Sequence, residues 1–552
     1  MVVAPLEGNT YTGGVYLVPS GIDTMRAESG ENALTSTRDA TPGVVPGNGT
    51  AASTSGRVDT FCTRHFVALA LLVLGLAAFN LTFRLGQEFL TEWDESLYAT
   101  TAAEALDGGH WIGTTFHGAL DYYNTKPPLN VWLIALAFKT FGKGLIALRM
   151  MSAGAAWLTV AVLVFWVRRS QGAAVALVAG VVLATSFGFV HIHAGRSANT
   201  DAMFTLLVLL TVVALWAEEA RPWARVWLGP LLAATFLLRG MAVLMPLFIV
   251  GLVWLMRPRR PRQWAPTLVG LMLCLLPVGA WLVARFEVDR WEFLNRLFFY
   301  DFVARSTDVI EGHPGGLLYY PNILQKHQFD WLFAGVVALW VAPIPWATLR
   351  RWFEDWRMRE RSSLAVLLLV WAAVTFVEPT LMQTKLPWYL NSFYPVFAIA
   401  IAWLGVRAVE TLSLVSRPWR SPALATAFLL AFVIAEGKLV WYSFAYRDLG
   451  LSDQSLVLAE MAQIAGHRVF RDQADRAGTF VTSGLAGAES RFAADPESFL
   501  HDSQPGDFLL VSGTVSNPDL DFVRSNGHYW LYRHNRSHHH GAGAGVANPK
   551  HD

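Results

Sequence analysis

The stretch Phe66–Phe83, which reads FVALALLVLGLAAFNLTF, decides the fold class of this chain. It is uncharged and apolar over roughly the 20 residues that an α-helix needs to cross a bilayer. Comparable runs recur along the 552 residues, of which 53% are hydrophobic and only 15% are charged. Soluble domains carry about 25% charged residues. So many long apolar runs predict an α-helical polytopic membrane protein.

About eleven apolar runs are candidate spans of the membrane. They lie at residues 65–84, 149–167, 172–191, 201–217, 227–239, 241–256, 265–284, 331–349, 363–379, 389–406 and 422–440. The run 128–141 is shorter, and we expect it to form a re-entrant or surface-lying helix. Many of the 23 tryptophans lie near the ends of the apolar runs, where amphipathic rings favour the membrane interface.

The basic residues predict which side of the membrane each loop faces. Arginines gather in short connections, at Arg168-Arg169, 257–262, 350–361 and 417–420. Short basic loops usually face the cytoplasm, so the N-terminus is predicted to be cytoplasmic. The segments then expected on the outer face are 85–148, 192–200, 285–330, 380–388 and everything after about residue 441.

Composition divides the chain into four predicted regions. Residues 1–62 are rich in Gly, Ser, Thr and Pro, which favours a disordered cytoplasmic segment. Residues 63–443 hold the apolar runs and form the predicted transmembrane domain. Residues 444–536 are predicted to be a small extracytoplasmic α/β domain, and residues 537–552 a disordered tail.

Within the C-terminal region, short apolar runs predict one helix and three strands. We expect a helix at Leu456–Ile464 and strands at Thr479–Thr482, Phe508–Ser512 and Tyr529–Arg533. The region carries no evident catalytic motif. The two cysteines form no metal-binding or disulfide pattern, and a net charge of +1 gives no reason to expect nucleic acid as a partner.

Asp94 and Glu95 follow the first apolar run, between Trp93 and Tyr98. A carboxylate that aromatic rings partly desolvate can have its pKa tuned to act as a general base. Tyr98 comes one helical turn after Asp94, so the two side chains can face the same cleft. The alternative is purely structural, because Thr91 and Asp94 also resemble a helix capping box and acids suit the first turn of a helix.

Lys126 precedes Pro127-Pro128 at the end of the same outer loop. A lysine fixed at this point can bind an anionic group such as a phosphate. The same residues also fit a plain helix start with a lysine that reaches for the interface.

Further polar side chains are predicted on the same face. Asp201 opens a span, Arg239 lies at the turn of a predicted hairpin, and Lys385 and Tyr389 belong to a later outer loop. The loop 285–330 adds further charged and aromatic residues, at Arg305, Glu311, His313, Tyr319, Tyr320 and Lys326. Cations and aromatic rings on one membrane face suit a lipid-linked phosphate better than a neutral substrate.

In this order, the motifs resemble those of the polyprenyl-phosphate-dependent glycosyltransferases of the GT-C fold. The nearest groups are the bacterial aminoarabinose (lipid A) transferases and the protein O-mannosyltransferases. The resemblance covers about residues 65–440. The matching residues are Trp93-Asp94-Glu95 with Tyr98, Gly109-His110-Trp111-Ile112, Lys126-Pro127-Pro128-Leu129, Phe141-Gly142, Arg149-Met150-Met151-Ser152-Ala153, Asp201, Arg239-Gly240 and Lys385-Leu386-Pro387-Trp388-Tyr389. The chain departs from the family at Arg239-Gly240, where Lys-Gly is usual.

The resemblance implies a GT-C-like fold and transfer of a sugar, with inversion, from an undecaprenyl-phosphate-type donor. The acceptor would be lipid A, an envelope glycan or a protein, on the outer face of the bacterial cytoplasmic (inner) membrane. The implied catalytic residues are Asp94, Glu95 and Asp201. The implied phosphate-binding residues are Lys126, Arg239, Lys385, Tyr98 and Tyr389.

No cofactor is required by the sequence. Some relatives bind a divalent metal ion at this face, and the weak candidates for ligands here are Glu95, Asp201 and His193. His191 and His193 are too close in sequence to share one face of a helix, which disfavours them as a pair of ligands.

The alternative function is a transporter or flippase of lipid-linked glycans. Transporters usually hold ionisable residues near the middle of their spans. Glu436 and Lys438 lie within or near the last predicted span, whereas most spans lack such residues and the acids gather in outer loops. This distribution favours chemistry at the membrane surface.

Overall fold

The computed structural model describes residues 54–91, 93–257, 264–310, 312–342, 363–412, 419–472 and 476–535. The last part of the N-terminal segment 1–62, which was predicted to be disordered, is helical, since α1 (Thr54–Arg64) begins there. The rest of this segment lies outside the described residues, as does the whole of the predicted tail 537–552. The same holds for most of the basic connections predicted at 257–262, 350–361 and 417–420.

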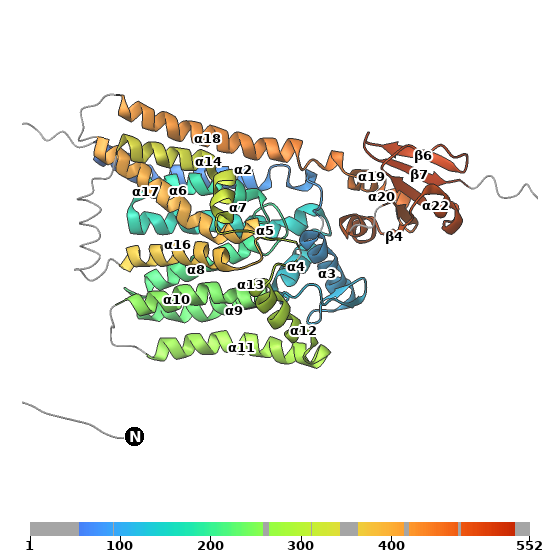
Figure 1. Ribbon diagram of the computed structural model, residues 1–552, viewed down its shortest axis with the longest axis horizontal. Helices are drawn as coiled ribbons and strands as arrows, with labels where there is room; N and C mark the ends of the chain where they lie inside the picture. The colour runs from blue at the N-terminus through green and yellow to red at the C-terminus, as the bar shows by residue number, and fades with distance from the viewer. Residues whose placement is uncertain are drawn as a thin grey trace, which may run out of the picture. The chain divides into compact units, whose positions relative to one another are not determined.

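A helix lies at every predicted span as far as the described residues reach, and residues 343–349 of the span predicted at 331–349 lie outside them. These helices are α2 (Phe66–Thr82), α5 (Leu145–Gln171), α6 (Ala173–Ala184), α8 (Asp201–Ala217), α9 (Leu228–Arg239), α10 (Leu244–Met256), α11 (Trp264–Asp289), α14 (Tyr319–Val341), α16 (Ser363–Leu381), α17 (Tyr394–Leu412) and α18 (Arg420–Ala445). Figure 1 shows most of them running along one common direction, with α17 oblique to the others. The short run predicted at 128–141 forms α4 (Leu129–Phe141), which is short as expected.

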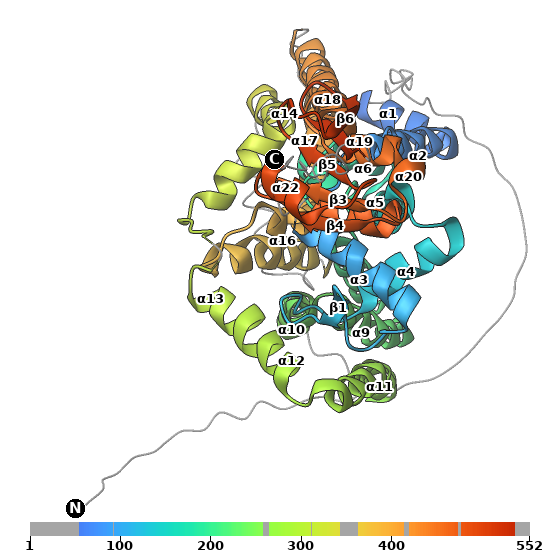
Figure 2. The same cartoon turned by 90° about the vertical axis from the view of Figure 1, so that its right-hand side faces the viewer.

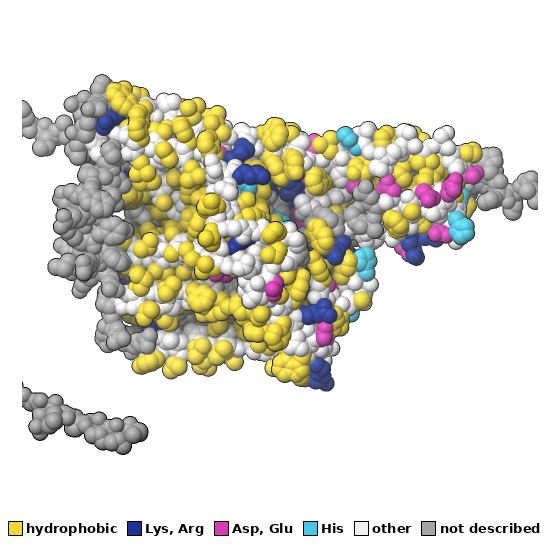
Figure 3. All heavy atoms as spheres, viewed as in Figure 1, with side chains coloured by type: hydrophobic (Ala, Val, Ile, Leu, Met, Phe, Trp, Pro, Cys, Tyr) yellow, Lys and Arg dark blue, Asp and Glu magenta, His cyan; other side chains and the backbone are white. Residues whose placement is uncertain are grey.

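The chain is a multi-pass membrane protein. Within the described residues, seven helical stretches are long and apolar enough to cross a membrane, and three shorter apolar helices accompany them. Figure 3 shows hydrophobic side chains covering the helical bundle, whereas charged side chains gather towards the end that carries the C-terminal region. A lateral surface of this kind suits contact with lipid rather than water.

Small side chains bring the central helices close together. Helix α6 is composed mainly of Ala and Val, and it packs against α2, α5 and α17. A Cβ on Gly180 would lie 2.5 Å from a methyl group of Val164 and 2.7 Å from one of Val73, so only glycine fits there. This close packing fixes the ends of the helices, from which the loops of the site extend.

The chain reverses between α9 and α10, as the predicted hairpin requires. Gly240 follows Arg239 with φ +57°, a backbone conformation that glycine adopts without strain. Arg239 therefore ends α9 at the loop end of the bundle. Near the same end lie α3 (Asp94–Gly108), η4 (Arg296–Ala304) and η5 (Pro387–Phe393).

The C-terminal region contains a five-stranded sheet of order β4-β3-β5-β7-β6. The strands are β3 (Arg468–Arg471), β4 (Glu489–Phe492), β5 (Phe508–Val511), β6 (Leu520–Ser525) and β7 (Trp530–His534). Strand β3 pairs in parallel with β4 and β5, and the other pairs are antiparallel. Helices α19 (Gln454–Ala459), α20 (Met461–Ile464) and α22 (Pro496–Asp502) accompany the sheet.

Two of the three predicted strands are confirmed, and so is the predicted helix, which breaks at Glu460. The strand predicted at Thr479–Thr482 is wrong. These residues join α21 (Arg476–Thr479) to the π-helical turn η7 (Phe480–Leu485). Phe480 is buried there, with its ring 6.3 Å from that of Phe138. A short apolar run does not distinguish a strand from a buried helical turn, and tertiary packing decided this one.

The C-terminal region shares a hydrophobic core with the loop end of the bundle. Tyr98 of α3 and Phe138 of α4 belong to the same buried cluster as Val457, Phe480 and Leu531. Figure 2 looks onto this end, with α3 and α4 beside the sheet. Residues 93–98 are therefore held from two sides, by the bundle and by the C-terminal region.

Candidate active site

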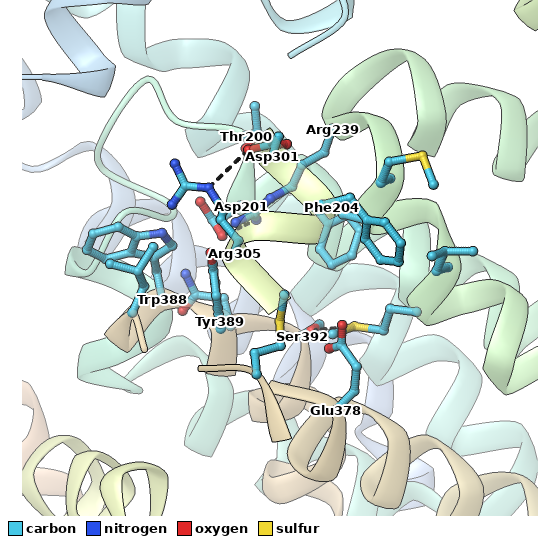
Figure 4. Close-up of a pocket in the computed structure, with 18 of the residues that line it drawn as sticks. Thr200, Asp201, Phe204, Arg239, Asp301, Arg305, Glu378, Trp388, Tyr389 and Ser392 are labelled. Carbon is cyan, nitrogen blue, oxygen red and sulfur yellow. Dashed lines mark hydrogen bonds and ion pairs between the residues drawn. The ribbon is translucent and has the colours of Figure 1, made fainter. Parts of the chain in front are cut away.

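One cavity of about 1160 Å³ lies where the loops at this end meet. The segments around it come from distant parts of the chain: the start of α3, the loop before α4, the start of α8, the α9–α10 turn, η4, α16 and η5. Figure 4 shows a part of this cavity. Of the predicted site residues, Asp94, Lys126, His193, Asp201, Arg239 and Tyr389 line it, and so do Arg305 and His313.

Asp94 is the first residue of α3 and lines the cavity half-buried. Its carboxylate accepts no hydrogen bond from any residue that the structure describes. Burial raises the pKa of Asp94, but Lys126, His193 and Arg239 together outweigh burial and hold it below its usual value. Asp94 is therefore ionised at neutral pH and has no fixed partner.

The predicted capping box is wrong. Helix α3 begins at Asp94 with Trp93 as its N-cap residue, so Thr91 lies outside the helix. The backbone N–H and the hydroxyl of Thr91 donate to Glu95 Oε2, at 3.0 and 2.8 Å. Trp93 has φ +72°, which is rare for a residue with a side chain. The turn therefore leaves the Asp94 side chain out of any cap.

Three cations face the cavity. Lys126 Nζ lies 6.0 Å from the ring centroid of Tyr98. Burial lowers the pKa of Lys126, but Tyr98 and Asp94 outweigh burial and raise it above its usual value, so the ammonium is charged. Arg239 pairs with Asp201, and Arg305 pairs with Asp301 at 3.1 Å. These side chains can bind an anion with several oxygens.

Aromatic rings support the cations. The guanidinium carbon of Arg239 lies 5.3 Å from the ring centroid of Phe204 and 5.6 Å from that of Tyr389. The ring of His193 stacks on Trp388 at 3.6 Å, with the two planes 7° apart. Burial and Arg239 keep the pKa of His193 below its usual value although Asp94 and Asp201 oppose them, so its ring is neutral at neutral pH.

Three predicted site residues do not line the cavity: Glu95, Tyr98 and Lys385. Tyr98 is 1% exposed and lies in the hydrophobic core beneath Lys126. Lys385 donates to the backbone carbonyls of Pro379, Thr380 and Met382, at the C-terminal end of α16. The Lys385 ammonium thus binds the end of a helix, as a cation there is expected to do.

Glu95 is fully buried behind Asp94. Its carboxylate accepts from Arg149 Nε at 2.7 Å and from the backbone N–H of Ala198 at 3.1 Å. It also lies 3.6 Å from Arg447. Burial raises the pKa of Glu95, but Arg149 and Arg447 outweigh burial and lower it to about 2.

Glu95 belongs to a buried charge network of Glu88, Glu95, Arg149, Arg196 and Arg447. Arg196 pairs with Glu88 at 2.5 Å, and Arg447 lies 3.3 Å from Glu88. The three arginines also donate to backbone carbonyls between residues 80 and 89. The network ties the segment before Asp94 to α5, to the loop 192–200 and to the end of α18.

The predicted metal candidates do not form a ligand set. Over the described residues, no group of three or more His, Cys, Asp or Glu side chains is arranged to hold a metal ion. Glu95 faces Arg149, Asp201 faces Arg239, and His193 stacks on Trp388.

Sequence reasoning missed several residues of the cavity. Asp301 lies in η4 with no recognisable motif around it, and only its spacing of four from Arg305 could have indicated a pair. Glu378 falls inside a predicted span, where its charge was the available signal. Asn391 and Ser392 were read as part of an apolar run.

Known proteins resemble this chain in sequence and in fold. Residues 125–283 match the family described as dolichyl-phosphate-mannose-protein mannosyltransferase. The crystal structure of ArnT from Cupriavidus metallidurans, bound to undecaprenyl phosphate, superposes with a TM-score of 0.59 at 15% identity, over 86% of this chain and 98% of that one. The chain has the GT-C fold. An Archaeoglobus fulgidus oligosaccharyltransferase shares this GT-C fold at a TM-score of 0.51 and 12% identity, over 77% of this chain and 64% of that one.

The expected resemblance to the aminoarabinose transferases is also confirmed. The undecaprenyl phosphate-alpha-4-amino-4-deoxy-L-arabinose arabinosyl transferase of Pseudomonas savastanoi pv. phaseolicola is 30% identical over 326 residues, which cover 57% of this chain and 57% of that protein. The corresponding protein of Edwardsiella ictaluri is 30% identical over 325 residues, or 56% of this chain and 54% of that one. The GT-C chain thus spans somewhat more than half the length of the curated relatives that it matches.

Proposed function

We propose that the protein is an integral membrane glycosyltransferase that moves a sugar from a polyprenyl-phosphate donor to an acceptor hydroxyl. The observation that carries the proposal is Asp94, an ionised carboxylate without a fixed partner, in a cavity that also presents Lys126, Arg239 and Arg305. A base for the acceptor and cations for a leaving phosphate are the two groups that this transfer needs. The names of the relatives, and the undecaprenyl phosphate bound to the similar ArnT, support the class of donor.

The reaction is a single displacement at the anomeric carbon. The acceptor oxygen forms a bond to that carbon from the face opposite the phosphate, and the bond between the carbon and the phosphate oxygen breaks, which inverts the centre. Asp94 takes the proton of the acceptor hydroxyl. Lys126, Arg239 and Arg305 stabilise the charge that develops on the departing polyprenyl phosphate.

The other predicted site residues then act through their neighbours. Asp201 holds Arg239 by an ion pair, and Tyr389 packs against the same guanidinium. Glu95 fixes the start of α3 through Arg149, and Lys385 holds the end of α16 beside η5. We propose these as positioning residues.

We further propose that the cavity opens to the extracytoplasmic side of a bacterial inner membrane. The basic connections predicted at the opposite end of the spans support this orientation. The acceptor hydroxyl would belong to lipid A, to another envelope glycan or to a protein.

Asp94→Asn tests the role of the base. The amide cannot take a proton, so we expect the rate of sugar transfer to fall by about 10²–10⁴-fold. The assay uses the purified full chain in detergent with a lipid-linked sugar, and mass spectrometry of the acceptor as readout. Asp107→Asn is the matched control, since Asp107 lies on the same helix and is 63% exposed.

Near-normal transfer by Asp94→Asn at an unchanged melting temperature would refute the role of Asp94. The detergent assay also separates the enzyme from the flippase alternative. A flippase has no activity without a sealed membrane, whereas a transferase forms its product in micelles.

A further inference from the structure

The cavity has a second wall that carries polar side chains without a role in the proposed chemistry. It lies between α10, α16 and η5, and its apolar part includes Met245, Phe248, Val374, Val377 and Leu381. Three polar side chains interrupt this apolar wall, and we call Glu378, Asn391 and Ser392 the polar wall. Helix α16 packs directly on η5, so the three belong to one continuous surface.

Glu378 differs from the other acids of the cavity. Asp201 is paired with Arg239 and Asp301 with Arg305, whereas Asp94 has no bonded partner in the described residues but is surrounded by cations. The Glu378 carboxylate has no hydrogen bond or ion pair within the described ranges, and Figure 4 shows it pointing from α16 into the cavity. An acid within a membrane-spanning helix is costly to keep, and it usually marks a functional contact.

Asn391 adds a second hydrogen-bond acceptor without a partner in the described residues. It is 2% exposed and lines the cavity. Its Nδ2 donates to the carbonyl of Ile192 at 2.9 Å, whereas its Oδ1 is buried and accepts no hydrogen bond in the described part of the chain. Buried polar atoms are nearly always hydrogen-bonded in folded proteins, so this oxygen lacks the partner that a bound molecule would supply.

Ser392 supplies a hydroxyl on the same wall. This hydroxyl donates a hydrogen bond of 3.4 Å to the sulfur of Met245, which is a weak acceptor. It can turn to donate or to accept elsewhere when a ligand binds. The polar wall therefore offers two unpaired hydrogen-bond acceptors, from Glu378 and Asn391, and one hydroxyl that can donate or accept.

Hydrogen-bond acceptors on this wall favour a ligand that carries hydrogen-bond donors. A phosphate is repelled by a carboxylate, and a hydrocarbon tail has no hydrogen-bond donor to offer. A sugar ring carries several donors, as hydroxyl or amino groups, and it is covalently linked to the phosphate that the cations bind. Arg239 lines the same cavity and its charge acts on Glu378. The cations that would bind the phosphate and the polar wall are therefore neighbours.

We propose that Glu378, Asn391 and Ser392 form the subsite that binds the sugar of the lipid-linked donor. The inference rests on the proposed function and names the group that the cavity recognises. Sites that hydrogen-bond a ligand group discriminate strongly against analogues that lack it, because their own polar groups are then left unpaired. The polar wall thus selects among lipid-linked sugars by the hydroxyl or amino group that donates a hydrogen bond to Glu378.

Binding measurements test the subsite independently of catalysis. The full chain is reconstituted in nanodiscs and titrated with undecaprenyl phosphate alone and with its mannose, arabinose and 4-amino-4-deoxy-arabinose conjugates. Glu378→Met is expected to lose about tenfold or more in affinity for the preferred conjugate, the loss typical of a hydrogen bond to a charged group. Its affinity for undecaprenyl phosphate without a sugar is expected to stay unchanged. Leu369→Met is the matched control, since Leu369 lies on the same helix, is exposed and does not line the cavity.

The outcomes separate the subsite from the proposed function. Equal weakening of the lipids with and without a sugar, or of neither, by Glu378→Met would overturn the subsite. Asn391→Leu gives a second reading, with the same selective loss expected. If the wild-type protein binds none of these lipids, the proposed function fails and the subsite fails with it.

Discussion

Asp94 and Glu95 are neighbours in sequence, yet they belong to two opposite electrostatic regions. Asp94 lies in a cavity where cations surround it and none is bonded to it in the described structure. Glu95 lies in the buried charge network, where its two oxygens are shared among Arg149, Thr91 and Ala198. The Asp94 carboxylate is thus free of hydrogen bonds in the described structure, whereas both oxygens of Glu95 accept them.

The difference shows how this fold separates positioning from chemistry. A carboxylate can serve as a base only if its proton site is not already occupied by donors. A base must also be held within a fraction of an ångström, which requires neighbours that do not move. The network provides the second condition one residue away from the site of the first.

Breaking the network is expected to have the largest effect. Arg149→Met leaves Glu95 buried without its main partner, which typically costs about 3–5 kcal/mol of folding stability. Thermal unfolding of the purified variant measures the loss. Arg169→Met is the control, because Arg169 is an exposed residue of the same helix. An unchanged melting temperature for Arg149→Met would mean that the network does not support the fold.

Breaking the cavity is expected to lower the rate more than it lowers the stability. Arg239→Ala removes a cation that we propose stabilises the leaving phosphate, and loss of one such contact typically lowers kcat by about 10²–10³-fold. Steady-state kinetics with a lipid-linked sugar give the value. Arg296→Ala, an exposed arginine of η4, is expected to transfer sugar normally. If Arg239→Ala unfolds the protein instead, Arg239 belongs with the network rather than with the cavity.

Acid is expected to sharpen the comparison through a smaller effect. The pKa of Glu95 lies at about 2 in the folded chain, against an ordinary value of 4.5. A lowered pKa contributes stability that is present above the ordinary value and is lost as the pH falls from 4.5 towards 2. The melting temperatures of wild type and Glu95→Gln should therefore converge over this range. A gap that stays constant with pH would contradict the ionised pair.

The sequence predicted the bundle because its signals are local. Each apolar run reports its own burial, and the order of the motifs brought Asp94, Lys126, Asp201 and Arg239 to one face. The different roles of Asp94 and Glu95 were not predictable in this way, since Arg149 and Arg447 lie far along the chain.

Other residues lie in surroundings that the sequence did not predict, for physical reasons of the same kind. Lys385 matched a motif, but its ammonium donates hydrogen bonds to backbone carbonyls at the end of α16. Glu378 was hidden because a single acid hardly changes the hydropathy of the run around it. Thr479–Thr482 took a helical form once Phe480 packed against α4.

The position of Arg447 bears on how the protein is made. This arginine follows the last helix of the bundle, yet it donates to Phe89 and lies beside Glu88 and Glu95, which follow the first predicted span. A chain that is threaded into the membrane in order therefore carries residues 85–95 without their final partner until α18 has emerged from the ribosome. The segment that presents Asp94 is among the first to be synthesised and the last to be completed, so a prematurely terminated product would insert its helices and still lack the finished Asp94 segment.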